Sequence, residues 1–244
     1  MSLELVTFGA GAAMTAAVLV GAISQQVTGF GFAIVCSPVF ALAVGAHDGV
    51  RLVNMLGVGM SAVSLMAWRR EVSWRDVLGL LVPAMFGVAC GAIVVRQLDN
   101  QVLMTVAGVL VLLAAAAIAS GLRIARLRGG FGTSVAGATS GIMNVIGGVS
   151  GPAVAIYAIN AGWPPTRFRA TVQAYFLALN LASVVALGAV APQSELTGSV
   201  LAAAAVGIVA GRRLGRSMSA ERVRTAVLVL ATVAGVAAIA RGLA

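Results

Sequence analysis

The chain has 244 residues, of which 60% are hydrophobic and only 9% are charged, and its formal net charge is +9 at pH 7. Soluble domains carry about 25% charged residues, so this composition excludes an ordinary soluble fold and indicates that lipid is the solvent. The positive charge does not indicate nucleic-acid binding. The arginines cluster in short interruptions between apolar runs, which is the pattern of a membrane protein.

Apolar runs follow one another along the whole chain and predict an all-α polytopic membrane protein with a single transporter domain, 1–244. The ten segments are 3–24, 31–46, 51–67, 76–95, 101–120, 131–146, 151–162, 169–190, 198–211 and 223–240. A full crossing needs about 20 residues. The second, sixth, seventh and ninth segments are therefore short for a span. The N-terminus lacks the basic region of a signal peptide, so we expect the first segment to be retained.

Weak internal repetition divides the chain into two halves, 1–122 and 123–244, of five segments each. The matches pair Gly87 and Gly91 with Gly207 and Gly211, Arg96 with Arg216, Thr105 with Thr225, and Gly21-Ala22-x-Ser24 with Gly137-Ala138-x-Ser140. An odd number of segments per half makes the two copies antiparallel across the bilayer. Inverted repeats of this kind are typical of secondary transporters. The paired Gly-x-x-x-Gly motifs themselves are best explained by close helix packing.

The arginines also predict the orientation. With the N-terminus outside, thirteen arginines face inward (69, 70, 75, 123, 126, 128, 167, 169, 212, 213, 216, 222 and 224) and three face outward (51, 96 and 241). The positive-inside rule then places both termini on the outer side of the membrane. Loop charge does not distinguish full crossings by segments one and two, or six and seven, from re-entrant hairpins. The short second and seventh segments favour half-helices.

Two glycine-rich interruptions are the candidate binding site. Irregular backbone at membrane depth is tolerated only beside protein or a watery cavity, and each interruption precedes a helix whose first N–H groups attract anions. Pro152 fits the first turn of the second such helix, whereas Pro38 lies inside its segment and predicts a kink. The candidate residues are Ser24, Gln25, Gln26, Thr28, Gly29 and Gly31 in the first copy, and Asn144, Gly147, Gly148, Ser150, Gly151 and Pro152 in the second, with Ser140 nearby.

Charged and amide residues refine this hypothesis. The seven acids (Glu4, Asp48, Glu71, Asp76, Asp99, Glu195 and Glu221) fall in or beside predicted loops, which argues against a cation substrate and a carboxylate proton relay. We expect no cofactor and no metal. Arg169 opens the eighth segment and is a candidate substrate ligand, with an ordinary inner-face charge as the alternative. Asn54, Gln173 and Asn180 lie within segments and either line the path or bond neighbouring helices.

Two features resemble functional motifs without their chemistry. Gly148-Val149-Ser150-Gly151 matches the G-x-S-G nucleophile motif of rhomboid proteases, but the only histidine is His47 and none follows Ser150 to act as the base. Cys36 and Cys90 lack metal-type spacing and are interpreted as buried packing residues. The sequence is therefore not expected to encode an enzyme.

Three runs resemble the sulfite exporter TauE/SafE family. They are GFGFAIVCSP (29–38), AWRREVSWRD (67–76) leading into GLLVPAMFGVACG, and SGIMNVIGGVSGPAVAIYAINAGWPPTRFRAT (140–171), and the resemblance covers nearly the whole chain. It implies a bacterial inner-membrane protein that moves sulfite, sulfonates or related anions. The family's glycine-rich elements fall on Gly29, Gly31 and Pro38, and on Gly147, Gly148, Gly151 and Pro152. Phe30 and Phe32 depart from the commoner G-x-G-G-G pattern, so the substrate is open.

Together these patterns predict an exporter of a small sulfur-containing anion that works by alternating access within the lipid bilayer. Two alternatives stay open: ion-coupled uptake of a similar anion, and a non-transporting membrane subunit that scaffolds an enzyme complex. The sequence leaves the oligomeric state undetermined, with a homodimer as one option.

Overall fold

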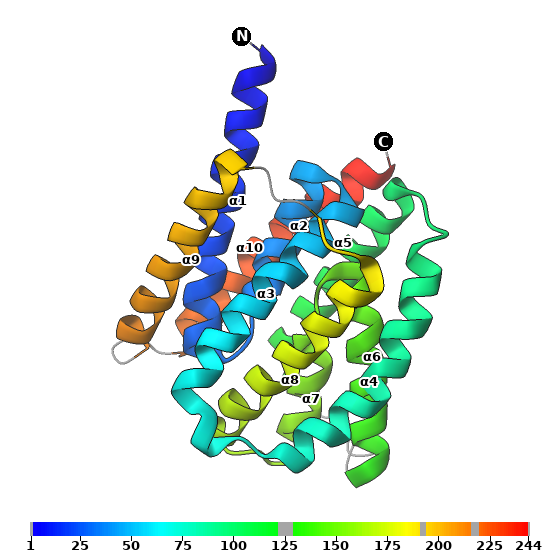
Figure 1. Cartoon of the computed structure of the whole chain (residues 1–244), viewed down its shortest axis with the longest axis vertical. Coiled ribbons are helices and arrows are strands. Elements are labelled where there is room, and N and C mark those ends of the chain that lie inside the picture. Colours follow the sequence, from blue (N-terminus) through cyan, green and yellow to red (C-terminus); the bar gives the residue numbers. More distant parts are fainter. Residues whose placement is uncertain (1, 122–128, 191–193, 216–219, 244) are drawn as a thin grey trace.

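The computed structural model describes residues 2–121, 129–190, 194–215 and 220–243, which form ten α-helices and one short 3-10 helix, with no strand in these ranges (Figure 1). Seven helices are long and apolar enough to cross a membrane: α1, α3, α4, α5, α8, α9 and α10. The elements are α1 (Ser2–Thr28), α2 (Phe32–Val44), α3 (Ala46–Trp68), η1 (Arg69–Glu71), α4 (Trp74–Val95), α5 (Asn100–Ala119), α6 (Gly129–Gly147), α7 (Gly151–Asn160), α8 (Pro165–Leu187), α9 (Ser194–Leu214) and α10 (Ala220–Leu243).

The ten helices match the ten predicted segments, but several boundaries were predicted wrongly. Helices α6 and α9 have 19 and 21 residues, so neither is too short to cross. Helix α8 begins four residues before its predicted start, which moves Arg169 from the first position into the second turn. The early start follows from Pro164 and Pro165, because proline fits the beginning of a helix and loses no hydrogen bond there.

Helices α2 and α7 are half-length, with 13 and 10 residues. At 1.5 Å per residue they measure about 20 Å and about 15 Å, less than the roughly 30 Å hydrocarbon core. Helix α2 returns to the end of the molecule that holds both termini, where Arg241 at the end of α10 donates to the Leu42 carbonyl (Figure 1). Helix α7 runs to the opposite end, where Thr133 near the start of α6 donates to the Tyr157 hydroxyl over 2.7 Å. The two half-helices therefore start deep inside and leave in opposite directions.

Glycines allow the longest helices to pack in close pairs. A Cβ on Gly87 of α4 would overlap the Ala138 carbonyl oxygen of α6, and a Cβ on Gly207 of α9 would lie 2.6 Å from Cβ of Ala22 in α1. The packing interpretation of both Gly-x-x-x-Gly motifs is thus confirmed. Gly207 follows Gly87 by 120 residues and Ala138 follows Ala22 by 116, so one contact repeats the other at the offsets of the internal repetition. This supports the inverted repeat, which stays a prediction.

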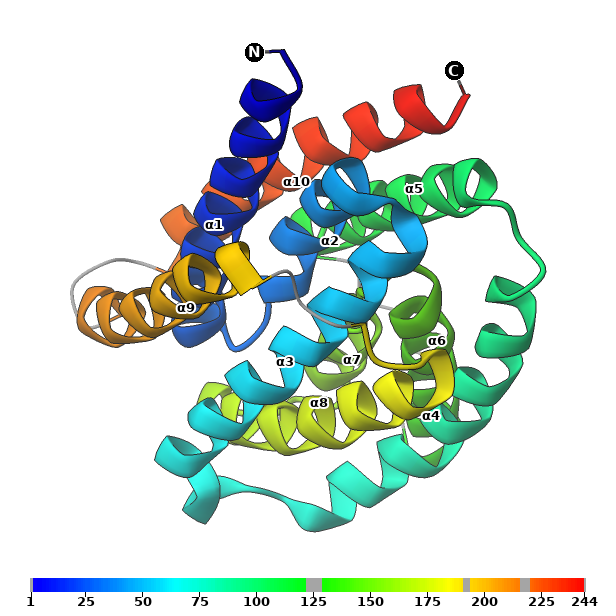
Figure 2. The same cartoon turned by 45° about the horizontal axis from the view of Figure 1, so that its top comes forward.

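The two halves interlock around a central pair of helices. Helices α3 and α8 lie side by side at the centre, α1 with α9 on one flank and α4 with α6 on the other, while α5 packs on α10 (Figure 2). Large apolar side chains on the outer helix faces stay exposed, among them Phe86, Val185 and Val233. In a bilayer those side chains face lipid. Cys36 is buried as predicted, but Cys90 on α4 is exposed, so its prediction as a buried packing residue is wrong. The interior holds two apolar core clusters and also contains buried serine, asparagine and glutamine side chains.

Candidate functional site

The first interruption consists of residues 29–31, between α1 and α2. Helix α1 continues to Thr28, so the prediction that the break begins at Gln25 and includes Gln26 and Thr28 is wrong. Their polar groups are satisfied within and between helices: Thr28 Oγ1 lies 2.9 Å from the Ser24 carbonyl oxygen, and Gln26 Nε2 lies 2.6 Å from Ser64 Oγ. The chain turns at Gly29 (φ +89°) and Gly31 (φ +123°), a backbone conformation that other residues rarely adopt.

The second interruption consists of residues 148–150, between α6 and α7. Gly147 is the last residue of α6, and Gly151 and Pro152 begin α7, where the predicted helix-starting proline is confirmed. Gly148 has a φ of +68°. Side chains from other elements hold this turn, because the Ser37 hydroxyl of α2 donates to the Gly147 carbonyl and Ser140 Oγ donates to the Ser150 carbonyl over 3.0 Å.

The two interruptions meet inside the molecule. Phe30 of the first packs on Gly151, the residue that directly follows the second, where an added Cβ would lie 3.2 Å from Phe30 Cβ. Measured along α2 and α7, the breaks lie about 20 Å and about 15 Å from opposite ends of the molecule, which is near mid-depth for each. The starts of α2 and α7 therefore face a shared space. Their first N–H groups, which have no partner within the helix, are directed to that space.

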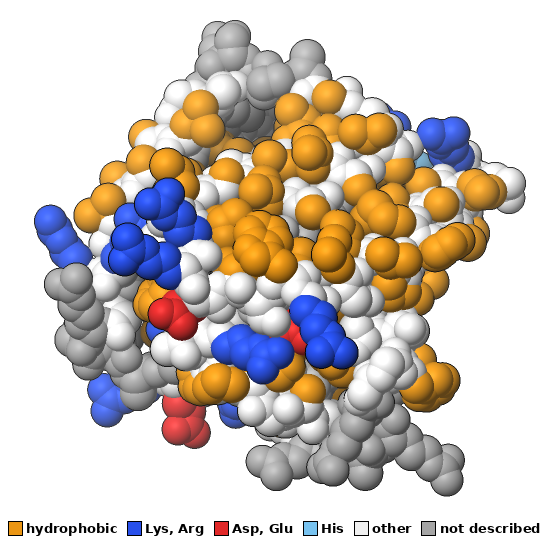
Figure 3. Space-filling model, turned by 60° about the horizontal axis from the view of Figure 1, so that its bottom comes forward, with side chains coloured by type: hydrophobic (Ala, Val, Ile, Leu, Met, Phe, Trp, Pro, Cys, Tyr) orange, Lys and Arg blue, Asp and Glu red, His pale blue; other side chains and the backbone are white. Residues whose placement is uncertain are grey.

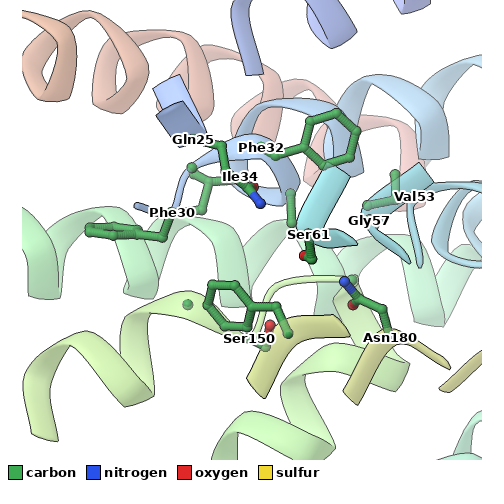
Figure 4. Close-up of a pocket in the computed structure, with 14 residues that line it drawn as sticks. Gln25, Phe30, Phe32, Ile34, Val53, Gly57, Ser61, Ser150 and Asn180 are labelled. Carbon is green, nitrogen blue, oxygen red and sulfur yellow. The ribbon is translucent and has the colours of Figure 1, made fainter. Parts of the chain in front are cut away.

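One small cavity occupies this junction (Figure 4). Its volume is about 20 Å³, enough for a single water molecule. The walls come from both interruptions and from α1, α2, α3 and α8: Gln25, Phe30, Gly31, Phe32, Ala33, Ile34, Val53, Gly57, Ser61, Gly148, Ser150, Gly151, Phe176 and Asn180. At this volume the cavity is too small to hold an oxyanion.

Ser61 is the polar group of this cavity that the sequence did not identify. Its side chain is buried, and within the described part of the chain its Oγ has no hydrogen-bond partner. A buried hydroxyl without a partner costs about 1–3 kcal/mol, so such a group calls for a ligand or a water. In Figure 4, Ser61, Ser150 and Asn180 surround the same space. The hydroxyl of Ser61 is thus an available donor.

Gln25 connects the first interruption to α8. Gln25 Nε2 donates to Gln173 Oε1 over 3.0 Å, and Gln173 Nε2 donates to the Gly29 carbonyl over 2.9 Å. Both side chains are buried. This relay fixes the position of the turn and leaves Gln25 on the cavity wall.

Asn144 does not line the cavity but centres a buried amide cluster beside it. Its Nδ2 lies 2.6 Å from Asn54 Oδ1, 2.9 Å from Ser183 Oγ and 3.3 Å from Asn180 Oδ1. One NH₂ group has only two hydrogens, so three acceptors compete for it. The Asn144 Oδ1 atom has no partner among the described residues. The cluster therefore has capacity left for a ligand or a bound water.

Two arginines approach the first interruption from the end opposite the termini. Arg169 packs on Gly29, where an added Cβ would lie 3.2 Å from Arg169 Cγ, and its neighbour Phe168 makes an edge-to-face contact with Phe30 at 6.0 Å between ring centroids. Arg224 of α10 lines a second small cavity with Ser24, Thr28 and Gly31. The sequence placed Arg224 among the inner charges but gave no sign of this contact, because α10 is far away along the chain.

The acidic residues fit the expectation for an anion path. The described carboxylates are Asp48, Glu71, Asp76, Asp99 and Glu221, and each is at least partly exposed. Asp76 in the first turn of α4 pairs with Arg167 in the first turn of α8. The Glu4 and Glu195 side chains lie outside the described part of the structure. No described carboxylate therefore lies at the interruptions.

Of the predicted site residues, Gln25, Gly31, Gly148, Ser150 and Gly151 line the central cavity. Ser24 and Thr28 line the second small cavity, and Gln26 turns to Ser64. Gly29, Asn144, Gly147, Pro152 and Arg169 lie next to the cavity wall without forming it. Asn180, which the sequence left between two interpretations, both lines the cavity and bonds to a neighbouring helix.

A family model described as "Sulfite exporter TauE/SafE" matches residues 13–238, which include both interruptions, helices α2 to α9 and most of α1 and α10. No curated protein and no solved structure matches the chain.

Proposed function

The chain belongs to the sulfite exporter TauE/SafE family, and we propose that it exports a small sulfur-containing anion, such as sulfite or an organosulfonate, through the junction of its two interruptions. The family is one of membrane transporters of sulfur anions. The main observation that supports transport through this junction is the cavity shared by the two interruptions. Both interruptions, the unpartnered Ser61 hydroxyl and the Asn180 amide converge on it.

The donors at this junction suit an anion that carries its charge into a low-dielectric interior. The starts of α2 and α7 supply N–H groups and the positive ends of two helix dipoles. Ser61, Ser150 and Asn180 add side-chain donors in place of the anion's water. Because these donors are dipoles and not fixed positive charges, the anion is held without the strong binding that would prevent its release. Helix ends hold anionic substrates in this way in other transporters built from broken helices.

Release on either side requires the two interruptions to separate. The contacts that close the cavity are the packing of Phe30 on Gly151 and the hydrogen bond from Ser37 to Gly147. Both join one half of the chain to the other, so movement of one half against the other would open the cavity. We infer that these contacts form the occluded state of an alternating-access cycle.

We infer the orientation from the arginines. Arg51, Arg96 and Arg241 lie at the end of the molecule with the termini, whereas the opposite end carries clusters of arginine (Figure 3). Arg123, Arg126, Arg128 and Arg216 lie outside the described residues. The positive-inside rule then places the arginine-rich end in the cytoplasm and both termini outside. An inside-negative potential favours export by about 2.3 kcal/mol per charge per 100 mV, so export needs no coupling ion.

The test is sulfite efflux from proteoliposomes that contain the purified protein. We expect efflux that saturates with internal sulfite and accelerates under an inside-negative potential. The variant Asn180→Leu should reduce the rate at least tenfold. Asn160→Ala serves as the control, because its Nδ2 bonds only locally to the Ile156 carbonyl at the far end of α7. Wild-type protein without any sulfite flux would contradict the proposal and favour a scaffold subunit.

Ion-coupled uptake is the second candidate, and the amide cluster supports it. Asn54 Oδ1, Asn180 Oδ1 and Ser183 Oγ all accept from Asn144 Nδ2. Rotation of the Asn144 amide would bring its Oδ1, which has no partner among the described residues, beside these three oxygens, and oxygen atoms are the ligands that hard cations prefer. Uptake predicts that an inward sodium or proton gradient drives accumulation of sulfite without any imposed potential. Export predicts that neither gradient has this effect.

A further inference from the structure

A second and larger cavity opens at the end of the molecule that holds the termini. Its volume is about 190 Å³, far above the roughly 10–15 Å³ needed for one water. Three basic side chains stand on its walls, His47 and Arg51 from α3 and Arg96 from the end of α4. We refer to this cavity as the outer vestibule. It has room for an oxyanion together with part of its hydration shell.

The charges in the outer vestibule are largely uncompensated. Arg51 pairs with Asp48 at 3.3 Å, but both side chains are partly exposed, and ion pairs of this kind are weak. Arg96 Nη2 donates to the Ala186 carbonyl over 2.9 Å, which orients the guanidinium without neutralising it. A guanidinium has five N–H donors, so most of those on Arg51 and Arg96 stay available. Guanidinium groups bind oxyanions through paired, charge-assisted hydrogen bonds.

The floor of the outer vestibule adjoins the amide cluster. Val50 and Val145 are part of the vestibule lining. Val50 supplies the carbonyl that accepts from Asn54 Nδ2 over 2.9 Å, and Val145 directly follows Asn144. One layer of apolar side chains therefore separates the basic vestibule from the polar groups next to the central cavity.

We propose that the outer vestibule is a second anion site, at which Arg51 and Arg96 bind a small inorganic oxyanion on the outer side of the transport path, beside His47, whose Nε2 donates to the Leu98 carbonyl over 3.1 Å. The proposal rests on the proposed function for its role in transport, though the binding itself is measured separately. An anion that passed outward between Val50 and Val145 would meet the Arg51 and Arg96 guanidinium groups before it reached bulk water. The site would also lower the external concentration at which the carrier is loaded from outside.

The chain contains one histidine, and it stands in this cavity, so its imidazole reports on the site directly. The experiment is NMR of ¹⁵N-labelled imidazole in detergent-solubilised protein that carries an affinity tag without histidine. Sodium sulfate or sodium sulfite is titrated at fixed pH, with sodium chloride at matched ionic strength as the reference. We expect a saturable shift of the His47 signals with sulfate or sulfite, and no saturable shift with chloride.

Variants locate the site. Arg51→Gln and Arg96→Gln should each raise the midpoint of the titration about tenfold, since each loses a charge-assisted contact. Arg241→Gln is the matched control, because Arg241 lies at the same end, bonds to a backbone carbonyl in the same way and is not part of the vestibule lining. An unsaturable response, an equal response to chloride, or unchanged midpoints in both vestibule variants would overturn the proposal.

Transport measurements separate this proposal from the proposed function. Arg96→Gln should raise the external half-saturating concentration in sulfite counterflow severalfold and leave the internal one unchanged. Asn180→Leu should reduce flux at least tenfold and leave the His47 titration intact. A saturable His47 titration in a protein without flux would support the vestibule and refute the transport function. Sulfite flux without any His47 response would support the transport function and refute the anion site in the outer vestibule.

Discussion

Replacing Ser61 by alanine should affect stability and anion binding in opposite directions. The Ser61 hydroxyl is buried on the cavity wall without a partner in the described structure. Its removal relieves an unsatisfied polar group that costs about 1–3 kcal/mol, so the ligand-free variant should be more stable by about 1 kcal/mol once the lost packing of the oxygen is subtracted. For a chain of this length, that corresponds to a rise of about 2–4 °C in melting temperature.

The same substitution should weaken the anion complex. A hydrogen bond to a charged group contributes about 1.5–3 kcal/mol, which corresponds to about a 10- to 150-fold rise in the dissociation constant of sulfite. Both effects are measured on one preparation, by thermal unfolding in detergent with increasing sulfite. The variant should begin at a higher melting temperature than the wild type and gain less from the ligand.

Ser64→Ala is the matched control, one turn further along α3. Ser64 Oγ donates to the Met60 carbonyl over 2.7 Å and accepts from Gln26 Nε2 over 2.6 Å, so alanine leaves a buried amide without its partner. This variant should lose about 1–3 kcal/mol of stability. If Ser61→Ala were destabilised like the control, or kept the sulfite affinity of the wild type, Ser61 would not be a vacant donor for the anion.

Three further changes have defined outcomes. Gly148→Ala should lower the free energy of unfolding by about 1–2 kcal/mol, because alanine is strained at φ +68°, and should also reduce sulfite flux. Gly162 has the same φ and open space around it, so the control Gly162→Ala should lose similar stability but keep its flux. Equal fluxes in the two variants would show that Gly148 is not part of the site. Gly87→Ala should destabilise the protein by about 1–3 kcal/mol in thermal unfolding, because the new Cβ would overlap the Ala138 carbonyl and push α4 away from α6. An unchanged melting temperature would show that α4 and α6 pack less closely than described. Arg169→Gln should raise the internal half-saturating sulfite concentration severalfold. Arg222 is exposed at the start of α10, so the control Arg222→Gln should leave this concentration unchanged. The same result for both variants would show that Arg169 is an ordinary inner-face charge.

The sequence was sufficient to predict the ten helices, because glycine, proline or polar residues interrupt the apolar sequence between one helix and the next. Helix ends were less predictable. The sequence predicts a polar break at Gln25, Gln26 and Thr28, yet the helix continues through them. Their side chains find hydrogen-bond partners in Gln173, Ser64 and the Ser24 carbonyl, respectively. Two of those three partners come from distant helices. No local pattern reveals them.

Part of the candidate site was also visible in the sequence. Glycine with positive φ marks both turns, and for this reason Gly31 and Gly148 were found. Ser61 was not found, since a single hydroxyl in an apolar helix does not reveal which face is buried. Lipid-facing and protein-facing positions are both apolar in a membrane protein, so hydrophobic periodicity does not separate them. Only the packing of α3 on α8 places Ser61 opposite Asn180.

The most direct measurement is an experimental structure of the purified protein with selenite, whose selenium atom is located by its anomalous scattering. We expect one selenium position between residues 29–31 and 148–151, within hydrogen-bond distance of Ser61 Oγ, in a cavity expanded beyond the present volume of about 20 Å³. A saturated crystal with no selenium at this junction, or with selenium held only at the surface, would contradict an anion site formed by the two interruptions.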